Sequence, residues 1–337
     1  MNRRWHGILL LAGAAFLALL VRRTGLAEIA ADAESVGWLF VPVLLLYGVA
    51  YACNTEAWRL SMPRDGVRPS FWRTYAITVS GFSLNFVTPL VNAGGEPYRA
   101  AAVAPWLGRR QAATSVIVHR VQNTLALLLT WLTALLLALV LLPRSAPLVG
   151  ALLAAAATIG VLAWLLMHWH RHRVLESALD LLRRLPLPGG LAGRIESKRG
   201  ALAEMDEYIA EAHRASPGRF WAALALEYTG RCLYAVEYWL ICFGMGIPAS
   251  FPKIYLIAGL SSFVLNALFL VPFELGSKEG ILYLLFDLTG LDPHAGVSMA
   301  IVSRARDLLW IAVGLALLSI LRPRQSAPAP AAEIAGP

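Results

Sequence analysis

The stretch Pro89-Leu-Val-Asn-Ala-Gly-Gly-Glu96 interrupts an apolar run of the chain, and Pro272-Phe-Glu-Leu-Gly-Ser-Lys-Glu279 interrupts another in the same manner. In each stretch the proline precedes the final glutamate by seven residues. An arginine follows each glutamate at a similar distance, Arg120 after 24 residues and Arg304 after 25. A spacing that is kept twice in one chain indicates an internal repeat, here over about residues 74–142 and 254–321.

The two halves share further residues around these motifs. Four side chains that carry an amide or a carboxylate recur beside the prolines and the arginines: Asn85, Asn123, Asn266 and Asp307. The residues that suit a break and restart of a helix are Gly94, Gly95, Pro97 and Gly276. Both halves are therefore expected to contain a helix that stops, breaks and begins again.

The surrounding sequence is typical of an integral membrane protein. The 337 residues have a mean hydropathy of +0.61, 58% are hydrophobic and only 15% are charged, whereas soluble domains carry about a quarter charged residues. The apolar residues gather in long runs with almost no charge, as membrane-spanning helices require. This pattern argues against a soluble enzyme, a disordered chain or a disulfide scaffold. The three cysteines lie in apolar runs and form no CxxC pair.

Basic residues predict the orientation in the membrane. Most of the 29 Lys and Arg lie near the N-terminus, after 321, and within 59–73, 99–110 and 168–219, and cytoplasmic segments are enriched in these residues. With both ends inside, 74–110 begins and ends on the cytoplasmic side and 254–296 on the outer side. Neither segment then crosses the bilayer. We therefore expect an all-α protein with about six full spans and two re-entrant helical hairpins in an inverted repeat.

A single polytopic membrane domain is expected over residues 1–321, beginning with an uncleaved span at 5–21. Residues 168–218 are predicted to form a basic cytoplasmic linker, with an amphipathic interfacial helix at 174–185. The Pro/Ala-rich tail 322–337 is expected to be disordered. Three histidines at the start of the linker fit an interfacial belt better than a metal site: His168, His170 and His172.

The motif Gly94-Gly95-Glu96-Pro97-Tyr98-Arg99, after a helix with Asn-x3-Pro and together with the Pro-x6-Glu motif of the second half, resembles the flippase-like membrane domain of lysylphosphatidylglycerol synthases. The resemblance covers about residues 1–321 and implies lipid translocation across the cytoplasmic membrane. The synthases carry a soluble aminoacyl-transferase domain after the membrane part, and this sequence stops at residue 337 without one. The resemblance is therefore expected to be to a stand-alone member. The second half departs from the family, which often has Gly-Gly or Gly-x-Gly where this chain has Glu274-Leu-Gly-Ser-Lys-Glu279.

Charged side chains inside the membrane indicate a substrate site. A charge at the bilayer centre costs roughly 2.5–3.5 kcal/mol, so Glu96, Arg120, Glu279 and Arg304 are predicted to bind substrate, with the planar arginines on a headgroup phosphate. The same residues also fit two buried ion pairs, Glu96–Arg120 and Glu279–Arg304, that hold the hairpins against neighbouring spans. The four amide and carboxylate residues above either line the cavity or hydrogen-bond between helices.

Another group of charges lies on the predicted span 219–243. Glu227 and Arg231 are spaced i,i+4 and are expected to neutralise each other. Together with Glu237 they form either a polar cavity wall or a packing contact. In the second hairpin, Ser277 is predicted to cap the restarting helix, whose free N–H groups favour anions.

These observations predict translocation of a phospholipid or a polyprenyl/isoprenoid-type lipid by a flippase or exporter that works by alternating access. Two alternatives stay open, a membrane-embedded transferase acting on lipid-linked substrates and a small-solute secondary transporter. The sequence holds no Asp-x-Asp, His-x4-Asp, His-Glu-x-x-His or Walker motif. No enzymatic activity, cofactor or metal is therefore expected.

Membrane lipid is the expected partner and nucleic acid is not, while ion coupling and a homo-oligomer are compatible with this interpretation. The expected location is a bacterial-type cytoplasmic (inner) membrane, multi-pass, with the N- and C-termini inside.

Overall fold

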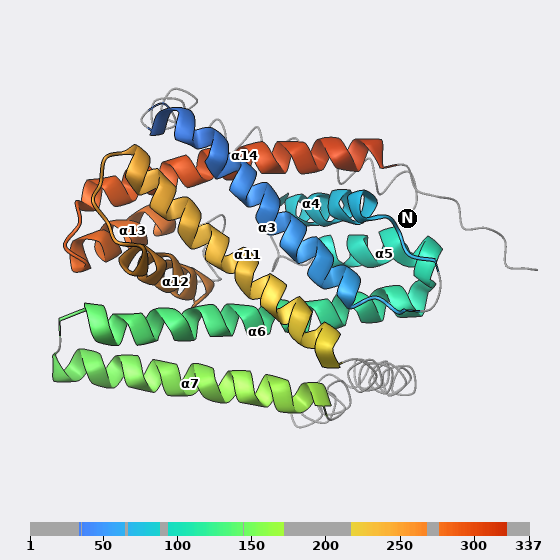
Figure 1. Ribbon diagram of the computed structural model, residues 1–337, viewed down its shortest axis with the longest axis horizontal. Coiled ribbons are helices and arrows are strands. Elements are labelled where there is room, and N and C mark those ends of the chain that lie inside the picture. Colours follow the sequence, from blue (N-terminus) through green and yellow to red (C-terminus); the bar gives the residue numbers. More distant parts are fainter. Residues whose placement is uncertain are drawn as a thin grey trace, which may run out of the picture.

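The computed structural model describes residues 34, 36–64, 67–87, 94–143, 145–171, 217–267 and 276–321. Every regular element in these ranges is a helix, as predicted (Figure 1). In chain order the helices are η1 (Gly37–Leu39), α3 (Phe40–Leu60), α4 (Phe71–Val87), α5 (Gly95–Leu107), α6 (Arg109–Leu141), α7 (Ala146–Arg171), α11 (Pro217–Gly244), α12 (Phe251–Ala267), α13 (Ser277–Leu288) and α14 (Pro293–Ile320).

Several predictions fall on other parts of the chain. The first span, the 174–185 helix, the tail and both motif prolines, Pro89 and Pro272, lie outside the described residues. So do His172 and the side chains of His168 and His170.

The helices differ in whether they are long enough to cross a lipid bilayer. Within the described residues, three segments are long and apolar enough to cross a membrane: Gly37–Leu60, Arg109–Leu141 and Ala146–Met167. Helices α11 and α14 have 28 residues each but carry charged residues in their interiors. Helices α5 and α13 have 13 and 12 residues, which at the helical rise is about 18–20 Å, less than the ~30 Å hydrocarbon core. This length fits the predicted re-entrant hairpins, which remain a prediction.

Packing follows the same scheme in both halves. Helices α3 and α11 lie side by side through the centre of the bundle, and α6 and α14 run in opposite directions (Figure 1). Each short helix packs on the long helix that follows it, α5 on α6 and α13 on α14. The helix before each break packs on the other half, α4 on α14 and α12 on α6. The two halves are thus interlocked, because one helix of each half packs on the other half.

Small residues allow these helices to approach closely. A side chain on Gly95 would collide with the Gly81 carbonyl oxygen and the Asn85 side chain, so α5 can begin against α4 only with glycine there. At the α4–α14 contact, a side chain on Gly314 would collide with Ser83 in the same way. Close contact through small residues is the usual means of helix association in membranes.

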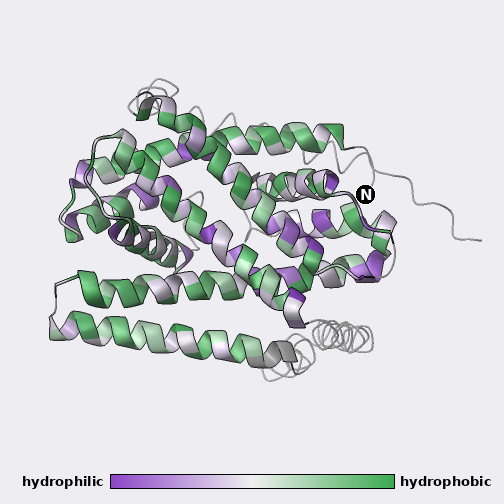
Figure 2. Ribbon diagram, viewed as in Figure 1, coloured by the Kyte–Doolittle hydropathy of each residue, from purple (hydrophilic) through white to green (hydrophobic). Residues whose placement is uncertain are grey.

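The outer faces of the bundle are apolar, while hydrophilic residues interrupt the central helix α11 (Figure 2). On α7, Leu153, Leu162 and Trp164 are 53%, 48% and 62% exposed. Such a surface is suited to lipid, because a contiguous apolar face of this kind is rare on soluble monomers. Helix α7 therefore presents an apolar surface, while Glu227, Glu237 and Arg306 are buried inside the bundle.

Both short helices begin where the sequence predicts, α5 at Gly95 and α13 at Ser277. The predicted cap of α13 is wrong by one residue. Gly276, with φ +80°, is the cap, and Ser277 is the first helical residue. A left-handed residue is needed at this corner, and glycine adopts that conformation without the steric cost that serine would meet.

Candidate functional site

Glu227 lies at the centre of a polar network that joins three helices. Its Oε1 accepts a hydrogen bond from Asn54 Nδ2 of α3 at 2.8 Å and lies 2.9 Å from His119 Nε2 of α6. Its Oε2 accepts from Asn123 Nδ2, also of α6, at 2.6 Å. Glu227 is only 3% exposed. Its buried charge is therefore stabilised by N–H donors, as burial of a carboxylate requires.

Arg231 is held beside this network by Asn123. Its guanidinium donates to the backbone oxygen of Asn123 at 3.2 Å and to Asn123 Oδ1 at 3.1 Å. Glu227 and Arg231 attract each other electrostatically, as the i,i+4 spacing predicts. The Glu227 carboxylate makes its hydrogen bonds to groups on α3 and α6. The amide of Asn123 bridges the two, donating to Glu227 and accepting from Arg231.

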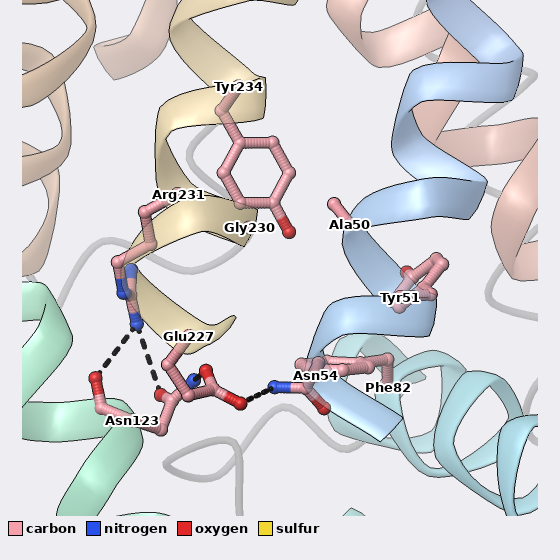
Figure 3. A pocket seen from close by; sticks show the side chains of 9 residues that line it. All are labelled: Ala50, Tyr51, Asn54, Phe82, Asn123, Glu227, Gly230, Arg231 and Tyr234. Carbon is pink, nitrogen blue, oxygen red and sulfur yellow. Dashed lines mark hydrogen bonds between the residues drawn. The ribbon is translucent and has the colours of Figure 1, made fainter. Parts of the chain in front are cut away.

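These residues border a cavity of about 140 Å³ between α11 and α3, here called the central cavity (Figure 3). Its walls come from α3, α4, α6 and α11, and its lining residues are Ala50, Tyr51, Asn54, Phe82, Asn123, Glu227, Gly230, Arg231 and Tyr234. The Tyr234 side chain points from α11 into the space between the two helices. The cavity combines aromatic walls with a few fixed polar groups, which is the usual composition of a ligand site.

A second charged cluster lies further along α11. Arg306 NH1 is 3.1 Å from Glu237 Oε2, and the two side chains are 5% and 1% exposed. The Arg306 guanidinium lies 3.8 Å from the centroid of the Tyr47 ring, a cation–π contact. Tyr47 in turn packs on Tyr234 of the central cavity, with ring centroids 5.1 Å apart. The two polar clusters are thus joined through a pair of tyrosine rings.

The four charged residues predicted from the repeat form two ion pairs at the starts of the short helices. Arg120 NH1 lies 3.3 Å from Glu96 Oε1, and Arg304 NH1 lies 2.5 Å from Glu279 Oε1. Arg120 is 58% exposed in this pair, whereas Arg304 is only 12% exposed. Within the described ranges, no ion pair joins the first couple to the second. The structure thus contains the two predicted ion pairs. A role of these four residues in substrate binding stays a prediction.

Polar side chains satisfy the backbone where each short helix begins. Asn85 Oδ1 accepts from the Gly95 N–H at 2.6 Å, and Glu279 Oε2 accepts from the Gly276 N–H at 3.0 Å. Gly94 is the N-terminal cap of α5, and Pro97 lies in its first turn. These residues thus build the helix starts, and one N–H at each start is already occupied.

The remaining predicted residues have separate surroundings. Asp307 contacts two cations, Lys278 Nζ at 3.7 Å and Arg306 Nε at 3.4 Å. Asn266 is exposed and donates to the Ser262 carbonyl oxygen of its own helix, away from the central cavity. Of the amide and carboxylate residues predicted to line a cavity, Asn123 is the one that lines the central cavity.

The sequence analysis missed Asn54, His119 and Arg306. Each is a polar residue within an apolar helix, which is itself a signal of function, but none takes part in the repeated spacing. Arg306 lies two residues after Arg304, and the repeated spacing identifies Arg304 and its partner Glu279 but gives no sign of the Glu237–Arg306 pair. In the part of the chain that the structure describes, no group of three or more His, Cys, Asp or Glu side chains is placed to hold a metal ion.

Comparison with known proteins gives one result that covers nearly the whole chain. Curated proteins and solved structures yielded no match. Residues 5–316 match the family model described as the lysylphosphatidylglycerol synthase TM region. The apolar helices and the buried charges agree with a membrane domain of this kind. The chain is therefore a helical membrane protein that belongs to the lysylphosphatidylglycerol synthase TM region family.

Proposed function

We propose that this protein moves a lipid, a phospholipid or a polyprenyl-type lipid, across a cytoplasmic membrane by alternating access. The observation that carries the proposal is the central cavity, a polar space inside a bundle whose outer faces are apolar. A lipid headgroup meets a high barrier in the hydrocarbon core because its polar groups lose water. A cavity lined by Asn54, Asn123 and Arg231 supplies substitute partners for such a headgroup.

The interlocked halves support a mechanism of this type. Transporters built from repeats bind their substrates near the repeat interface and expose the site alternately to the two sides. Here the central cavity lies between α3 and α11, and each half lends one helix to the other, α4 to α14 and α12 to α6. A tilt of one half against the other would change the spacing of α3 and α11 around the cavity.

The buried charges also support a transport function. Insertion of each charged residue into the bilayer centre costs roughly 2.5–3.5 kcal/mol, and the structure holds ion pairs at Glu96–Arg120, Glu279–Arg304 and Glu237–Arg306. Pairs of this kind can fix the helices in one arrangement and re-form in another. If these side chains served only to pack the helices together, apolar residues would stabilise the contacts equally well.

The test is reconstitution of the purified protein into phosphatidylcholine vesicles that carry a fluorescent NBD-labelled lipid, with dithionite added outside. Vesicles with the wild-type protein should lose the inner-leaflet signal as lipid moves outward, for NBD-phosphatidylglycerol or for an NBD-labelled polyprenyl phosphate. Glu96→Gln and Arg304→Ala should slow this loss. Glu56→Gln is the matched control, because Glu56 is 40% exposed near the end of α3 and pairs with nearby Arg59.

The proposal fails if the wild-type protein moves neither lipid and both variants fully restore the growth of a deletion strain. Movement of a soluble solute with no movement of lipid would favour the small-solute transporter instead.

A further inference from the structure

The arginines inside the bundle differ in their partners. Arg120, Arg304 and Arg306 each lie within ion-pair distance of a glutamate. Among the described residues, no carboxylate lies at that distance from Arg231 or Arg99. An arginine side chain keeps its charge in proteins. In the described part of the bundle, Arg231 and Arg99 are therefore buried positive charges that no carboxylate contacts directly.

One of these two arginines lines the central cavity, and the other lies behind its wall. Arg231 lines it directly. Arg99, which is 4% exposed, donates to the Thr78 carbonyl oxygen at 3.2 Å, and its guanidinium lies 4.4 Å from the centroid of the Phe82 ring. Phe82 is itself a wall of the cavity. One charge thus faces the cavity and the other lies behind its aromatic wall, which makes the cavity attractive to an anion.

The carboxylate of Glu227, which also lines the cavity, already has hydrogen-bond partners for both of its oxygens. Glu227 accepts from Asn54 and Asn123 and lies at hydrogen-bond distance from His119. Its neighbour Arg231 is fixed by the amide and backbone oxygens of Asn123. Asn123 therefore keeps the two side chains apart and holds the guanidinium in a set orientation, and a pre-oriented group loses less entropy on binding.

Two buried polar atoms of the lining residues have no hydrogen-bond partner among the described residues: Arg231 Nε and Asn54 Oδ1. Buried polar atoms are nearly always paired, and each exception calls for an explanation. A polar ligand in the cavity would supply the missing partner of Arg231 Nε. The planar guanidinium matches two oxygens of a phosphate group at once.

The size of the cavity limits what can enter. Its volume of about 140 Å³ is several times the roughly 30 Å³ that one water molecule occupies in the liquid. It is below the about 300–1,000 Å³ of sites that enclose drug-sized molecules. The cavity thus suits a phosphate group and not the acyl chains of the same lipid.

We propose that the central cavity binds the phosphate group of a lipid headgroup and that Arg231 is its direct ligand. This inference rests on the proposed function, which it deepens by naming the chemical group that is recognised. Asn123 is a positioning residue that holds Arg231, and Arg99 adds positive potential from behind Phe82.

Binding to the full-length protein in detergent tests the proposal without transport. Three probes are compared by isothermal titration calorimetry: dihexanoyl-phosphatidylglycerol, dihexanoylglycerol, which lacks the phosphate, and inorganic phosphate alone. The phosphate-bearing lipid should bind at least tenfold more tightly than dihexanoylglycerol. Arg231→Gln should abolish this preference, and Arg231→Lys, which keeps the charge and loses the fork, should reduce it. Arg59→Gln is the matched control, since Arg59 pairs with Glu56 away from the cavity, and should keep the preference.

Equal binding of the two lipids by the wild-type protein would overturn the proposal. So would an unchanged preference in Arg231→Gln, or binding of inorganic phosphate without any binding of the lipid. Should Arg231→Gln not fold, as judged by its elution and melting temperature, Arg231→Lys decides by the same criterion. Phosphate-dependent binding without lipid movement in vesicles would leave this site standing and remove the proposed function. Lipid movement with unchanged headgroup preference in the arginine variants would do the reverse.

Discussion

Glu237 and Arg306 form an ion pair that is buried from solvent, with side chains 1% and 5% exposed. Removal of one partner of such a pair leaves a buried charge unpaired and costs about 3–5 kcal/mol, whereas replacement of both by apolar residues can be neutral. We expect Glu237→Leu to destabilise the protein by about 3 kcal/mol, toward the lower end of that range, because Asp307 Oδ1 remains 3.4 Å from Arg306 Nε.

The measurement is unfolding of the purified protein in mixed micelles as SDS is increased. The double variant Glu237→Leu with Arg306→Met should recover most of the loss, and the difference from the two single variants gives the coupling between the residues. If Glu237→Leu is as stable as the wild-type protein, the pair contributes nothing to the fold and our interpretation of this cluster is wrong.

At the scale of residues, the repeated spacing predicts part of the site. The distance from each glutamate to its arginine identifies Glu96–Arg120 and Glu279–Arg304, and both pairs are present. The partners of Glu227 could not be predicted, because they come from α3 and α6, and only the packing of three helices decides which donor reaches the carboxylate. The i,i+4 rule describes an isolated helix and therefore considers only Arg231 as a partner of Glu227. Inside the bundle, groups on neighbouring helices compete for the Glu227 carboxylate and make the hydrogen bonds to it.

The contact between α4 and α5 depends on the small residue where α5 begins. A side chain on Gly95 would collide with the Gly81 carbonyl oxygen and with Asn85, and Asn85 Oδ1 is the acceptor of the Gly95 N–H. Asn85→Ala should cost about 1 kcal/mol, as loss of a cap does, and Gly95→Ala should cost more because backbone must move. Gly150→Ala on α7 meets nothing within 4 Å and should be neutral or stabilising by about 0.5–1 kcal/mol.

The same unfolding assay compares these three variants. A Gly95→Ala protein as stable as Gly150→Ala would show that α5 does not approach α4 as described.

At the scale of elements, most of the fold could be predicted. Apolar runs between polar breaks place the helices within a few residues, and the Pro-x6-Glu motifs locate the starts of α5 and α13. The exchange of α4 and α12 between the halves could not be predicted, since nothing in the local sequence specifies which distant helix a face will meet. The cap of α13 was missed by one residue because a serine and a glycine stand side by side, and only the backbone angle at Gly276 distinguishes them.

For the whole molecule, the account requires that α3 and α11 move apart and together around the central cavity. The chain offers a means to stop that motion. A Cβ atom placed on Gly230 of α11 lies 3.6 Å from the Cβ atom of Cys53 on α3, and disulfides join Cβ atoms about 3.5–4.5 Å apart. Gly230→Cys should therefore form a disulfide with Cys53 that ties the two helices together across the lining of the cavity.

The most direct measurement is lipid movement in vesicles that contain Gly230→Cys, assayed after oxidation and again after reduction, with the wild-type protein treated identically. Mass spectrometry of the peptides confirms that the disulfide has formed. Our account predicts that the oxidised variant does not move labelled lipid, that reduction restores movement, and that oxidation leaves the wild-type rate unchanged. Continued lipid movement while the disulfide is intact would contradict it.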